Sequence, residues 1–297
     1  MIYTLTLAPS LDYVMECDSI KIGQINRSKN EEYYPGGKGI NVSIVLKKLG
    51  MDSKALGFIG GFTGEYIKKS LNKMNISHEF VNVDGNSRIN VKIKGAVETA
   101  INGIGPRVSI DYYGDLMLIL NTLEANDFLI LSGSVIKDFS YDIYEKIMIF
   151  LKNRNINIIV DTYGEALMST LKWHPFLVKP NIYELCELFD IKINNFDELK
   201  KAASRLIELG AKNAIVSLGE FGALFINNDG ELIYDKGYKG HVKNTVGAGD
   251  AMVAGFVYSY IMDKDLKKAF AFSVASGCAA AFNETMPEKQ EILSLIE

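Results

Sequence analysis

Cysteine, histidine and long apolar runs are scarce in this chain of 297 residues, and each absence excludes a class of protein. The three cysteines, Cys17, Cys186 and Cys278, are odd in number and far apart, so neither a disulfide framework nor a cysteine metal site is expected. The three histidines are equally scattered, which argues against a zinc site and a histidine-based catalytic triad. No apolar run approaches the roughly 18 residues that a membrane-spanning helix needs. These absences favour a protein of the reducing cytoplasm.

The balance of charge excludes a further class. The chain has 32 basic and 36 acidic residues and a formal net charge of −4, so no overall positive field attracts nucleic acid. Met1 is followed directly by Ile-Tyr-Thr-Leu without a basic region, and we expect no secretory signal. The 48% hydrophobic content can fill a large core, and the length predicts a single domain over residues 1–297.

Short apolar strands alternate with helices along most of the chain. The predicted strands are Ile2–Leu7, Phe128–Leu131, Ile156–Val160, Phe176–Val178 and Ala214–Leu218. The predicted helices include Tyr141–Asn153, Gly164–Lys172, Ala271–Phe282 and two that begin at Ile182 and Asp197. Buried strands separated by helices are typical of a parallel sheet with both faces covered, so we expect an α/β fold.

Two segments depart from this alternation of strands and helices, Asn30–Tyr34 and Arg88–Lys94, and both have the pattern of exposed antiparallel strands. In the second, Ile89, Val91 and Ile93 alternate with polar residues, which places the polar set on one face. Strands outside the main sheet could form a lid over a ligand or a surface hairpin without a binding role. The pattern alone leaves both interpretations open.

The segment Asn244–Gly255 carries the strongest chemical signal. Gly247 and Gly249 allow a tight turn with uncovered backbone N–H groups, and Asp250 then opens an apolar helix. A helix N-terminus preceded by bare amides binds anions, and a carboxylate beside it can take a proton from a hydroxyl group. This combination suits phosphoryl transfer to an alcohol. The alternative is that Asp250 only caps its helix, as Asp often does.

A second glycine-rich segment, Pro35–Asn41, also opens a helix. It is not a P-loop, because the pattern GxxxxGK[ST] is absent. Its glycines would let a ligand lie against the backbone, with Lys38 meeting an anion and Asn41 giving directional hydrogen bonds. The alternative is an ordinary glycine turn. Asp12 follows the first strand, at the edge where ligands of α/β proteins gather, although taken alone it favours an ordinary turn aspartate.

Two further segments have both a structural and a functional interpretation. Asn181 and Glu184 have the spacing of a capping box, but they could also hold the water molecules of a magnesium ion. Ser217–Gly222 could wrap a nucleotide or form a hairpin. The glycine cluster Gly57–Gly64 lacks the dinucleotide fingerprint GxGxxG, which disfavours an oxidoreductase.

Together these segments resemble the ribokinase-like sugar kinase superfamily, in particular its phosphofructokinase B branch. The resemblance covers essentially the whole chain. Thr4–Asp12 is similar to the opening strand with its sugar-binding aspartate, and Pro35–Asn41 and Asn244–Gly255 are similar to the two signatures. Tyr34–Ser43 and Ser87–Lys92 are most similar to the 1-phosphofructokinases, followed by tagatose-6-phosphate kinases and minor 6-phosphofructokinases. Two distant signatures together are far more specific than either alone.

The resemblance implies a Rossmann-like, three-layer α/β/α core with a mainly parallel sheet and a β lid contributed by residues 12–34 and 88–104. It implies phosphorylation of fructose 1-phosphate to fructose 1,6-bisphosphate by ATP with Mg²⁺, and a homodimer formed through the lid. The residues implied in catalysis are Asp250, Gly247, Ala248 and Gly249. Those implied in sugar-phosphate binding are Asp12, Gly37, Lys38, Asn41, Arg88 and Asn90. Those implied in ATP binding are Lys179, Asn181, Glu184, Ser217, Gly219, Gly222 and Gly249, with Asn181 and Glu184 also in the outer shell of the magnesium ion.

Two positions depart from the family pattern. Val135-Ile136 stands where the family has Leu-Pro, so we infer no contact of that loop with the sugar. Ala251 stands where serine is frequent after the catalytic aspartate, which leaves the base itself present. A nucleotide sensor with a degraded active site is the alternative from another class of protein, and the retention of Asp250 with both signatures speaks against it.

Overall fold

A nine-stranded sheet forms the centre of the computed structural model, which describes residues 1–136, 140 and 142–297. Its strands are β1 (Ile2–Thr6), β4 (Lys54–Ile59), β5 (Ser77–Asn82), β8 (Phe128–Ser132), β9 (Asn157–Asp161), β10 (Leu177–Val178), β11 (Asn213–Ser217), β12 (Ala223–Asn227) and β13 (Leu232–Asp235). Their order is β13-β12-β11-β10-β9-β8-β1-β4-β5. All neighbours from β5 to β11 run parallel, and β12 and β13 add an antiparallel hairpin at one edge. The sheet is mainly parallel, as the sequence predicts.

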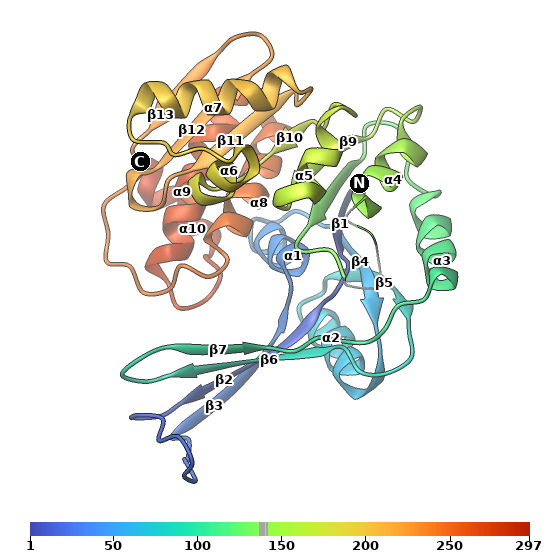
Figure 1. Cartoon of the computed structure of the whole chain (residues 1–297), viewed down its shortest axis with the longest axis vertical. Helices are drawn as coiled ribbons and strands as arrows, with labels where there is room; N and C mark the ends of the chain where they lie inside the picture. Colours follow the sequence, from blue (N-terminus) through green and yellow to red (C-terminus); the bar gives the residue numbers. More distant parts are fainter. Residues whose placement is uncertain (137–139, 141) are drawn as a thin grey trace.

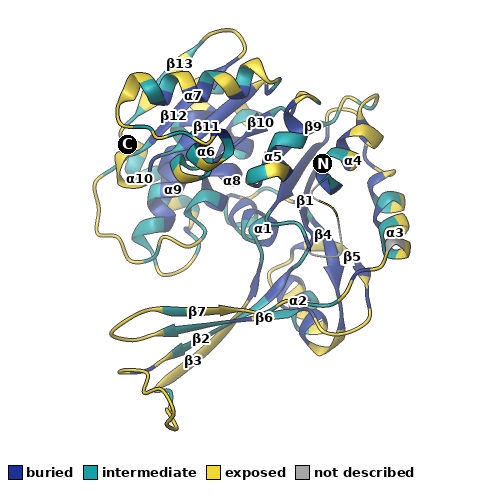
Figure 2. Ribbon diagram, in the orientation of Figure 1, coloured by how far each residue is buried: buried dark blue, intermediate teal, exposed yellow. Residues whose placement is uncertain are grey.

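Helices cover both faces of this sheet (Figure 1). One face carries α3 (Ile110–Leu120), α4 (Ile143–Leu151), α5 (Gly164–Leu171), α6 (Ile182–Phe189) and α7 (Phe196–Glu208). The other carries α1 (Lys38–Lys48), α2 (Gly61–Lys73), α8 (Ala248–Asp263) and α9 (Leu266–Phe282), with α10 (Lys289–Ile296) packed on α9. In β8, Leu129 and Leu131 pack with the first set of helices, and Phe128 and Ile130 pack with the second. The central strands are therefore buried on both faces (Figure 2).

A second, four-stranded sheet projects from the core (Figure 1). Its strands are β2 (Ser10–Glu16), β3 (Asn30–Gly36), β6 (Arg88–Lys94) and β7 (Thr99–Asn102), in the order β3-β2-β6-β7. The antiparallel pairing expected of Arg88–Lys94 is only half correct, because β6 pairs antiparallel with β7 but parallel with β2. A parallel pair needs a long connection between its strands. Here the chain passes through β3, α1, β4, α2 and β5 between β2 and β6.

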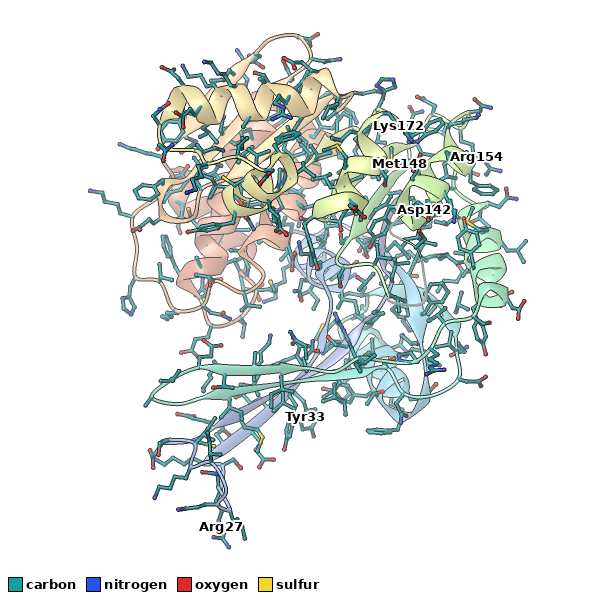
Figure 3. The ribbon with its side chains drawn as sticks, in the orientation of Figure 1. Arg27, Tyr33, Asp142, Met148, Arg154 and Lys172 are labelled. Carbon is teal, nitrogen blue, oxygen red and sulfur yellow. The ribbon has the colours of Figure 1, made fainter. Side chains whose placement is uncertain are left out.

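The register of this second sheet separates polar from apolar side chains. Ser10 lies opposite Arg88 and Asp12 lies opposite Asn90, so these four side chains share one face, which also includes Lys92. The other face carries an apolar row across all four strands, formed by Tyr33, Tyr13, Val91 and Ile101. Tyr33 is labelled on the projecting sheet in Figure 3. The alternation predicted for Arg88–Lys94 is therefore present.

Element boundaries agree with the sequence predictions to within five residues, and the largest difference is at α9, which begins at Leu266 and not at Ala271. The helix predicted at Tyr141–Asn153 is observed as Ile143–Leu151, and Tyr141 lies outside the described residues. The helix that opens after Pro35 is followed by Gly50, which has a positive φ of 86° and is a typical end signal. Among the described residues, no helix combines the length and apolarity needed to cross a membrane.

Candidate active site

The two glycine-rich segments meet in space, although Asn41 and Asp250 are 209 positions apart in the sequence. Asn41, in the first turn of α1, donates a hydrogen bond from Nδ2 to Asp250 Oδ2 at 2.7 Å. Gly37 is the N-cap residue of α1, directly before Lys38. The Lys38 side chain reaches the end of β9 at the carboxyl edge of the parallel sheet, which is where α/β proteins bind ligands.

Gly247 begins the helix that carries Asp250. It is the N-cap residue of α8 with a φ of 82°, which glycine adopts without steric cost. Among the described residues no side chain caps this helix, and the Asp250 carboxylate accepts its hydrogen bond from Asn41. Asp250 is therefore not the cap of its own helix. The first turn, which includes Ala248 and Gly249, presents the positive end of the helix dipole to an anion.

The Asp250 carboxyl group has a shifted pKa. Burial is the largest cause that raises the pKa of Asp250 to about 6, and the negative charge of Asp161 adds to the shift. Lys38, the hydrogen bond from Asn41 and Lys179 oppose it. A carboxyl group with this pKa is ionised at neutral pH and still basic enough to accept a proton in catalysis.

A buried ion-pair cluster lies beside Asp250. Asp161, the last residue of β9, binds Lys38 Nζ at 3.2 Å and Lys179 Nζ at 3.3 Å through the same oxygen, Oδ1. Burial would raise the pKa of Asp161, but the two ammonium groups outweigh it and lower that pKa. Burial would likewise lower the pKa of Lys38, but Asp161, Asp250 and Glu184 raise it. Asp161 is not among the site residues predicted from the sequence, and its place at the end of a buried strand is only a weak signal for such a role.

Lys179 connects this cluster to the start of α8. A Cβ atom added to Gly249 would lie 2.9 Å from Lys179 Nζ, so the ammonium group sits against this backbone turn. Lys179 is only 4% exposed. A buried positive charge and the helix N-terminus are therefore side by side, and both favour the same occupant, an anion such as a phosphate group.

The second sheet contributes a polar network around Asp12. The Asp12 carboxylate accepts hydrogen bonds from Ser10 Oγ at 2.7 Å, Asn90 Nδ2 at 2.9 Å and Lys92 Nζ at 2.9 Å. A Cβ atom on Gly36 would lie 2.5 Å from Asp12 Oδ1, so only glycine fits beside this carboxylate. The sequence points to Asp12 and Asn90 but not to Lys92, although Lys92 follows Asn90 by two residues on the same strand face.

Arg88 lines a cavity of about 200 Å³ together with Lys38 and Tyr163. In the part of the chain that the structure describes, the buried side-chain atoms without a hydrogen-bond partner include Arg88 Nε, Asn90 Oδ1, Ser132 Oγ and Asp161 Oδ2. Ser132 lines the same cavity. Buried polar atoms are normally paired, so this group of unpaired atoms indicates the place of a polar ligand or of water.

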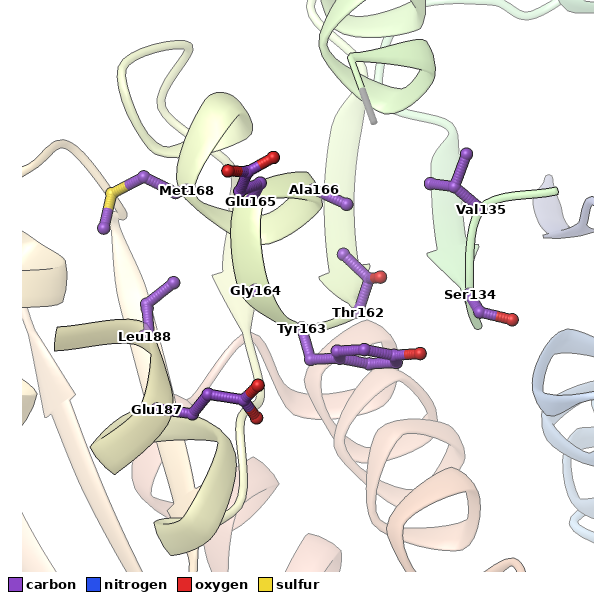
Figure 4. A pocket seen from close by; sticks show the side chains of 10 residues that line it. All are labelled: Ser134, Val135, Thr162, Tyr163, Gly164, Glu165, Ala166, Met168, Glu187 and Leu188. Atoms are coloured by element: carbon purple, nitrogen blue, oxygen red, sulfur yellow. The ribbon is translucent and has the colours of Figure 1, made fainter. Parts of the chain in front are cut away.

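A larger groove of about 520 Å³ opens between α5 and α6 (Figure 4). Ser134 and Tyr163 line both the groove and the smaller cavity, so the two adjoin each other. The groove also carries the carboxylates of Glu165 and Glu187 (Figure 4). Two acidic groups repel a phosphate, whereas the smaller cavity has two cationic walls. The smaller cavity is therefore the better phosphate site.

Asn181 and Glu184 form the capping box that their spacing predicts. Asn181 Oδ1 accepts a hydrogen bond from the Glu184 backbone N–H at 2.9 Å, and Glu184 Oε2 accepts one from the Asn181 N–H at 2.8 Å. The structural interpretation is thus correct. It is compatible with a second role, because Glu184 is close enough to Lys38 to raise its pKa.

The segment Ser217–Gly222 forms the turn of the hairpin between β11 and β12. The Leu218 N–H donates to Gly222 O at 2.8 Å, and Gly219 begins a short 3₁₀ helix within the turn. The Ser217 N–H donates to Pro180 O at 3.1 Å, which places this turn beside the segment that leads into α6. The hairpin interpretation is therefore correct, and nucleotide binding by Ser217, Gly219 and Gly222 stays a prediction.

A sequence model of the pfkB carbohydrate kinase family matches residues 5–286. This chain belongs to the pfkB family of carbohydrate kinases. It is 42% identical to a 1-phosphofructokinase of Bacillus subtilis over 297 residues, which cover 100% of this chain and 97% of the relative. It is 34% identical to a D-tagatose-1-phosphate kinase of Bacillus licheniformis over 293 residues, 98% of this chain and 96% of the relative. A crystal structure of a proposed phosphofructokinase from Staphylococcus aureus matches with a TM-score of 0.88 and 38% identity, covering 99% and 96% of the two chains.

Membership of this family makes the protein a carbohydrate kinase, an enzyme that transfers a phosphoryl group to an alcohol. The ribokinase-like α/β fold expected from the sequence is confirmed. The signatures on which the resemblance rested are the segments that the structure brings together at Asn41 and Asp250.

Proposed function

We propose that this kinase transfers the γ-phosphate of ATP to the 6-hydroxyl of fructose 1-phosphate, giving fructose 1,6-bisphosphate and ADP. The observation that carries the proposal is the 2.7 Å hydrogen bond between Asn41 and Asp250, because it joins the segment expected to bind sugar to the one expected to bind phosphate. The full-length likeness to the Bacillus subtilis 1-phosphofructokinase supports the choice of substrate.

Asp250 acts as the general base in this proposal. Its carboxylate accepts the proton of the 6-hydroxyl while the sugar oxygen attacks the γ-phosphorus and the bond to the leaving ADP oxygen breaks. The start of α8, with the turn Gly247–Gly249, stabilises the negative charge on the transferred group. Lys179 adds a positive charge at the same turn.

The sugar phosphate occupies the space between the core and the second sheet. Arg88 and Lys38 bind the phosphate that the substrate already carries, and both line the 200 Å³ cavity. Asp12, Asn41 and Asn90 orient the sugar hydroxyls. Arg88 Nε and Asn90 Oδ1 support this assignment, because each is buried with no hydrogen-bond partner among the described residues and a bound sugar phosphate would supply one.

A magnesium ion accompanies ATP in this proposal. The described residues contain no group of three or more His, Cys, Asp or Glu side chains that could hold a metal ion, so they fit an ion carried mainly by nucleotide phosphates. Asn181 and Glu184 would hold its water molecules, since the capping box uses Glu184 Oε2 and leaves Oε1 to bind water. When bound, such an ion neutralises charge on the β- and γ-phosphates.

The second sheet has two proposed roles. Its polar face, with the Asp12 network, closes over the site as a lid and excludes water that would otherwise hydrolyse ATP. Its other face exposes large apolar side chains, with Ile101 61% and Tyr33 54% exposed, and pairs with a second copy of the chain to form a homodimer. We place the reaction in the cytoplasm, where ATP is available.

The test is a coupled ADP-release assay on four substrates: fructose 1-phosphate, fructose 6-phosphate, tagatose 1-phosphate and tagatose 6-phosphate. We expect the highest kcat/KM with fructose 1-phosphate. Tagatose 1-phosphate is the closest competitor, because a relative of that name is 34% identical and the two sugars differ at one stereocentre. A higher kcat/KM with any other sugar phosphate would contradict the substrate assignment. ATP binding without ADP release on any sugar phosphate would favour the nucleotide-sensor alternative.

A further inference from the structure

The side chain of Asp161 has a position that the proposed reaction does not yet use. It is fully buried, with Oδ1 bound to both Lys38 and Lys179 and Oδ2 without a hydrogen-bond partner among the described residues. Asp161 is also the β-sheet partner of Ser132, whose hydroxyl is likewise buried and unpaired. A buried carboxylate with one unpaired oxygen is energetically unfavourable, and such an arrangement is unusual for a purely structural residue.

The two lysines that Asp161 binds serve different substrates. Lys38 lines the cavity that also contains Arg88, on the sugar-phosphate side. Lys179 lies against the backbone of Gly249, on the side of the transferred phosphate. Because both ammonium groups bind one oxygen, a single carboxylate fixes a cation of each half of the site.

We propose that Asp161 is a positioning residue that holds Lys38 and Lys179 on either side of the phosphoryl group in transfer. This inference rests on the proposed function. Lysine carries its charge on a flexible four-carbon stem, so an exact place for the charge needs an anchor. Without the carboxylate the two like charges repel each other. Lys38, whose side chain is 34% exposed, can then turn toward solvent, whereas Lys179, at 5%, is left unpaired in the interior.

The same carboxylate contributes to the electrostatic field at the general base. Among the described residues, the groups with the largest effect on Asp250 are Asp161 from β9, Lys38 and Asn41 from α1, and Lys179 from the segment after β10. Of these four, Asp161 is the negative one. Its removal therefore leaves two cations and a hydrogen-bond donor, all of which favour the ionised form of Asp250.

The decisive variant is Asp161→Asn, which keeps the shape of the side chain and removes its charge. We expect kcat at pH 8 to fall roughly 10- to 100-fold, because the two lysines lose their common anchor. We also expect the acidic limb of the kcat/KM profile to move to lower pH. A loss of stability alone would not move that limb. An Asp161→Asn enzyme with wild-type kcat and an unmoved acidic limb would overturn the proposal.

Asp127→Asn is the matched control. Asp127 is a buried carboxylate that binds the Met1 amino group at 2.6 Å, and it precedes β8 at the amino end of the strands. We expect its removal to leave kcat within about twofold and the acidic limb in place, since it lies at the opposite edge of the sheet from Asp250. An equal shift of the limb in both variants would show that the pH effect is not specific to Asp161 and would overturn the proposal.

A second comparison applies if Asp161→Asn fails to fold. Lys179→Met and the double variant Lys179→Met/Asp161→Asn are compared, because the double variant removes one buried charge of each sign. We expect the double variant to have a KM for the sugar phosphate at least about 5-fold higher than Lys179→Met, since Lys38 then has no anchor. Equal KM values would refute the proposal. If the wild type does not use fructose 1-phosphate, the proposed function fails, and the same comparison is made with whichever sugar phosphate it uses.

Discussion

At the scale of single residues, the chemistry depends on which groups surround each charge. Asp250 is buried, accepts a hydrogen bond from Asn41 and interacts electrostatically with the negative Asp161 and the positive Lys38. These contributions partly cancel, and they leave a carboxyl group with a pKa of about 6 rather than one that is either always charged or always neutral. The following predictions use that balance.

Replacement of the base should separate catalysis from nucleotide binding. We expect Asp250→Ala to lower kcat by about 10²- to 10⁴-fold, the range for loss of a general base, with little change in ATP affinity. In the wild type, kcat/KM should fall below a pH of about 6 as the carboxylate is protonated, and it should be flat above pH 7. Kinetics between pH 4.5 and 8.5 measure both effects. Near-normal turnover in folded Asp250→Ala would refute the assignment.

The same raised pKa has a cost in stability. Because the folded-state pKa of about 6 exceeds the usual value near 3.8, the protonated form favours folding, and that contribution is lost as pH rises from about 4 to 6. We expect Asp250→Asn to be more stable than the wild type by up to about 3 kcal/mol above pH 7 and equally stable near pH 4. Urea unfolding at both pH values tests this. A wild type that is the more stable at pH 8 would contradict it.

Arg88 should affect substrate affinity rather than chemistry. We expect Arg88→Ala to raise KM for the sugar phosphate by roughly 10- to 100-fold, since a charge-assisted contact to the phosphate is lost, while KM for ATP stays unchanged. Arg154→Ala is the control, because Arg154 bonds to Asn121 O at 2.6 Å on the far side of the core from the second sheet (Figure 3). An unchanged sugar-phosphate KM in Arg88→Ala would place the phosphate elsewhere.

At the scale of elements, the N-terminus of α8 has, among the described residues, no capping side chain that would keep a ligand away from its backbone. The helix is apolar and buried, so its stability does not depend on a capping side chain, and its N-terminus stays open to a ligand. α6 is the opposite case, because its capping box satisfies the end of the helix with its own side chains. Asn181 is therefore first of all a cap, whereas Asp250 is free of that role, as its proposed function as a base requires.

Gly249, directly before Asp250, should tolerate no side chain. A Cβ atom on Gly249 would lie 2.9 Å from Lys179 Nζ, so Gly249→Ala must displace the ammonium group. We expect at least a tenfold fall in kcat with a stable fold, because a displacement of a catalytic group by about 1 Å can lower the reaction rate about 100-fold. Gly114→Ala in α3 is the control, since a Cβ there meets nothing within 4 Å. It should leave kcat unchanged and stabilise the helix by about 1 kcal/mol. Wild-type turnover in Gly249→Ala would contradict the prediction.

At the scale of the whole molecule, the second sheet exposes large apolar side chains, among them Ile101 and Tyr33. Tyr33, Tyr13, Val91 and Ile101 form an apolar row on the face opposite Asp12, and α2 packs near one end of it through Tyr66, whose ring meets Tyr33 edge-on at 5.3 Å. An uncovered apolar face of this kind is typical of an interface between copies.

Charge placed on this face should prevent dimer formation. We expect the wild type to sediment as a dimer at micromolar concentration and Ile101→Lys to sediment as a monomer, because a buried unpaired lysine in the interface is strongly unfavourable. Leu118→Lys is the control, as Leu118 is 70% exposed on α3 and should leave the mass unchanged. A monomeric wild type, or a dimer that Ile101→Lys does not affect, would contradict the proposed interface.

Features that depend mainly on neighbours along the chain could be predicted from the amino-acid sequence. Alternating strands and helices gave the α/β class, and glycine turns that open helices marked Lys38, Asn41 and Asp250, because backbone freedom and helix termini are local properties. Asp161 follows a predicted strand, but that position alone does not separate a site residue from an ordinary turn aspartate. Lys92 lies within β6 among other polar residues, and no local pattern singles it out. The parallel pairing of β2 with β6 could not be predicted either, because 71 residues lie between Glu16, the last residue of β2, and Arg88, the first residue of β6. Which charges act on Asp250 follows from the folded arrangement alone, because electrostatic interactions depend on distance in space and on burial, and neither can be derived from the order of residues.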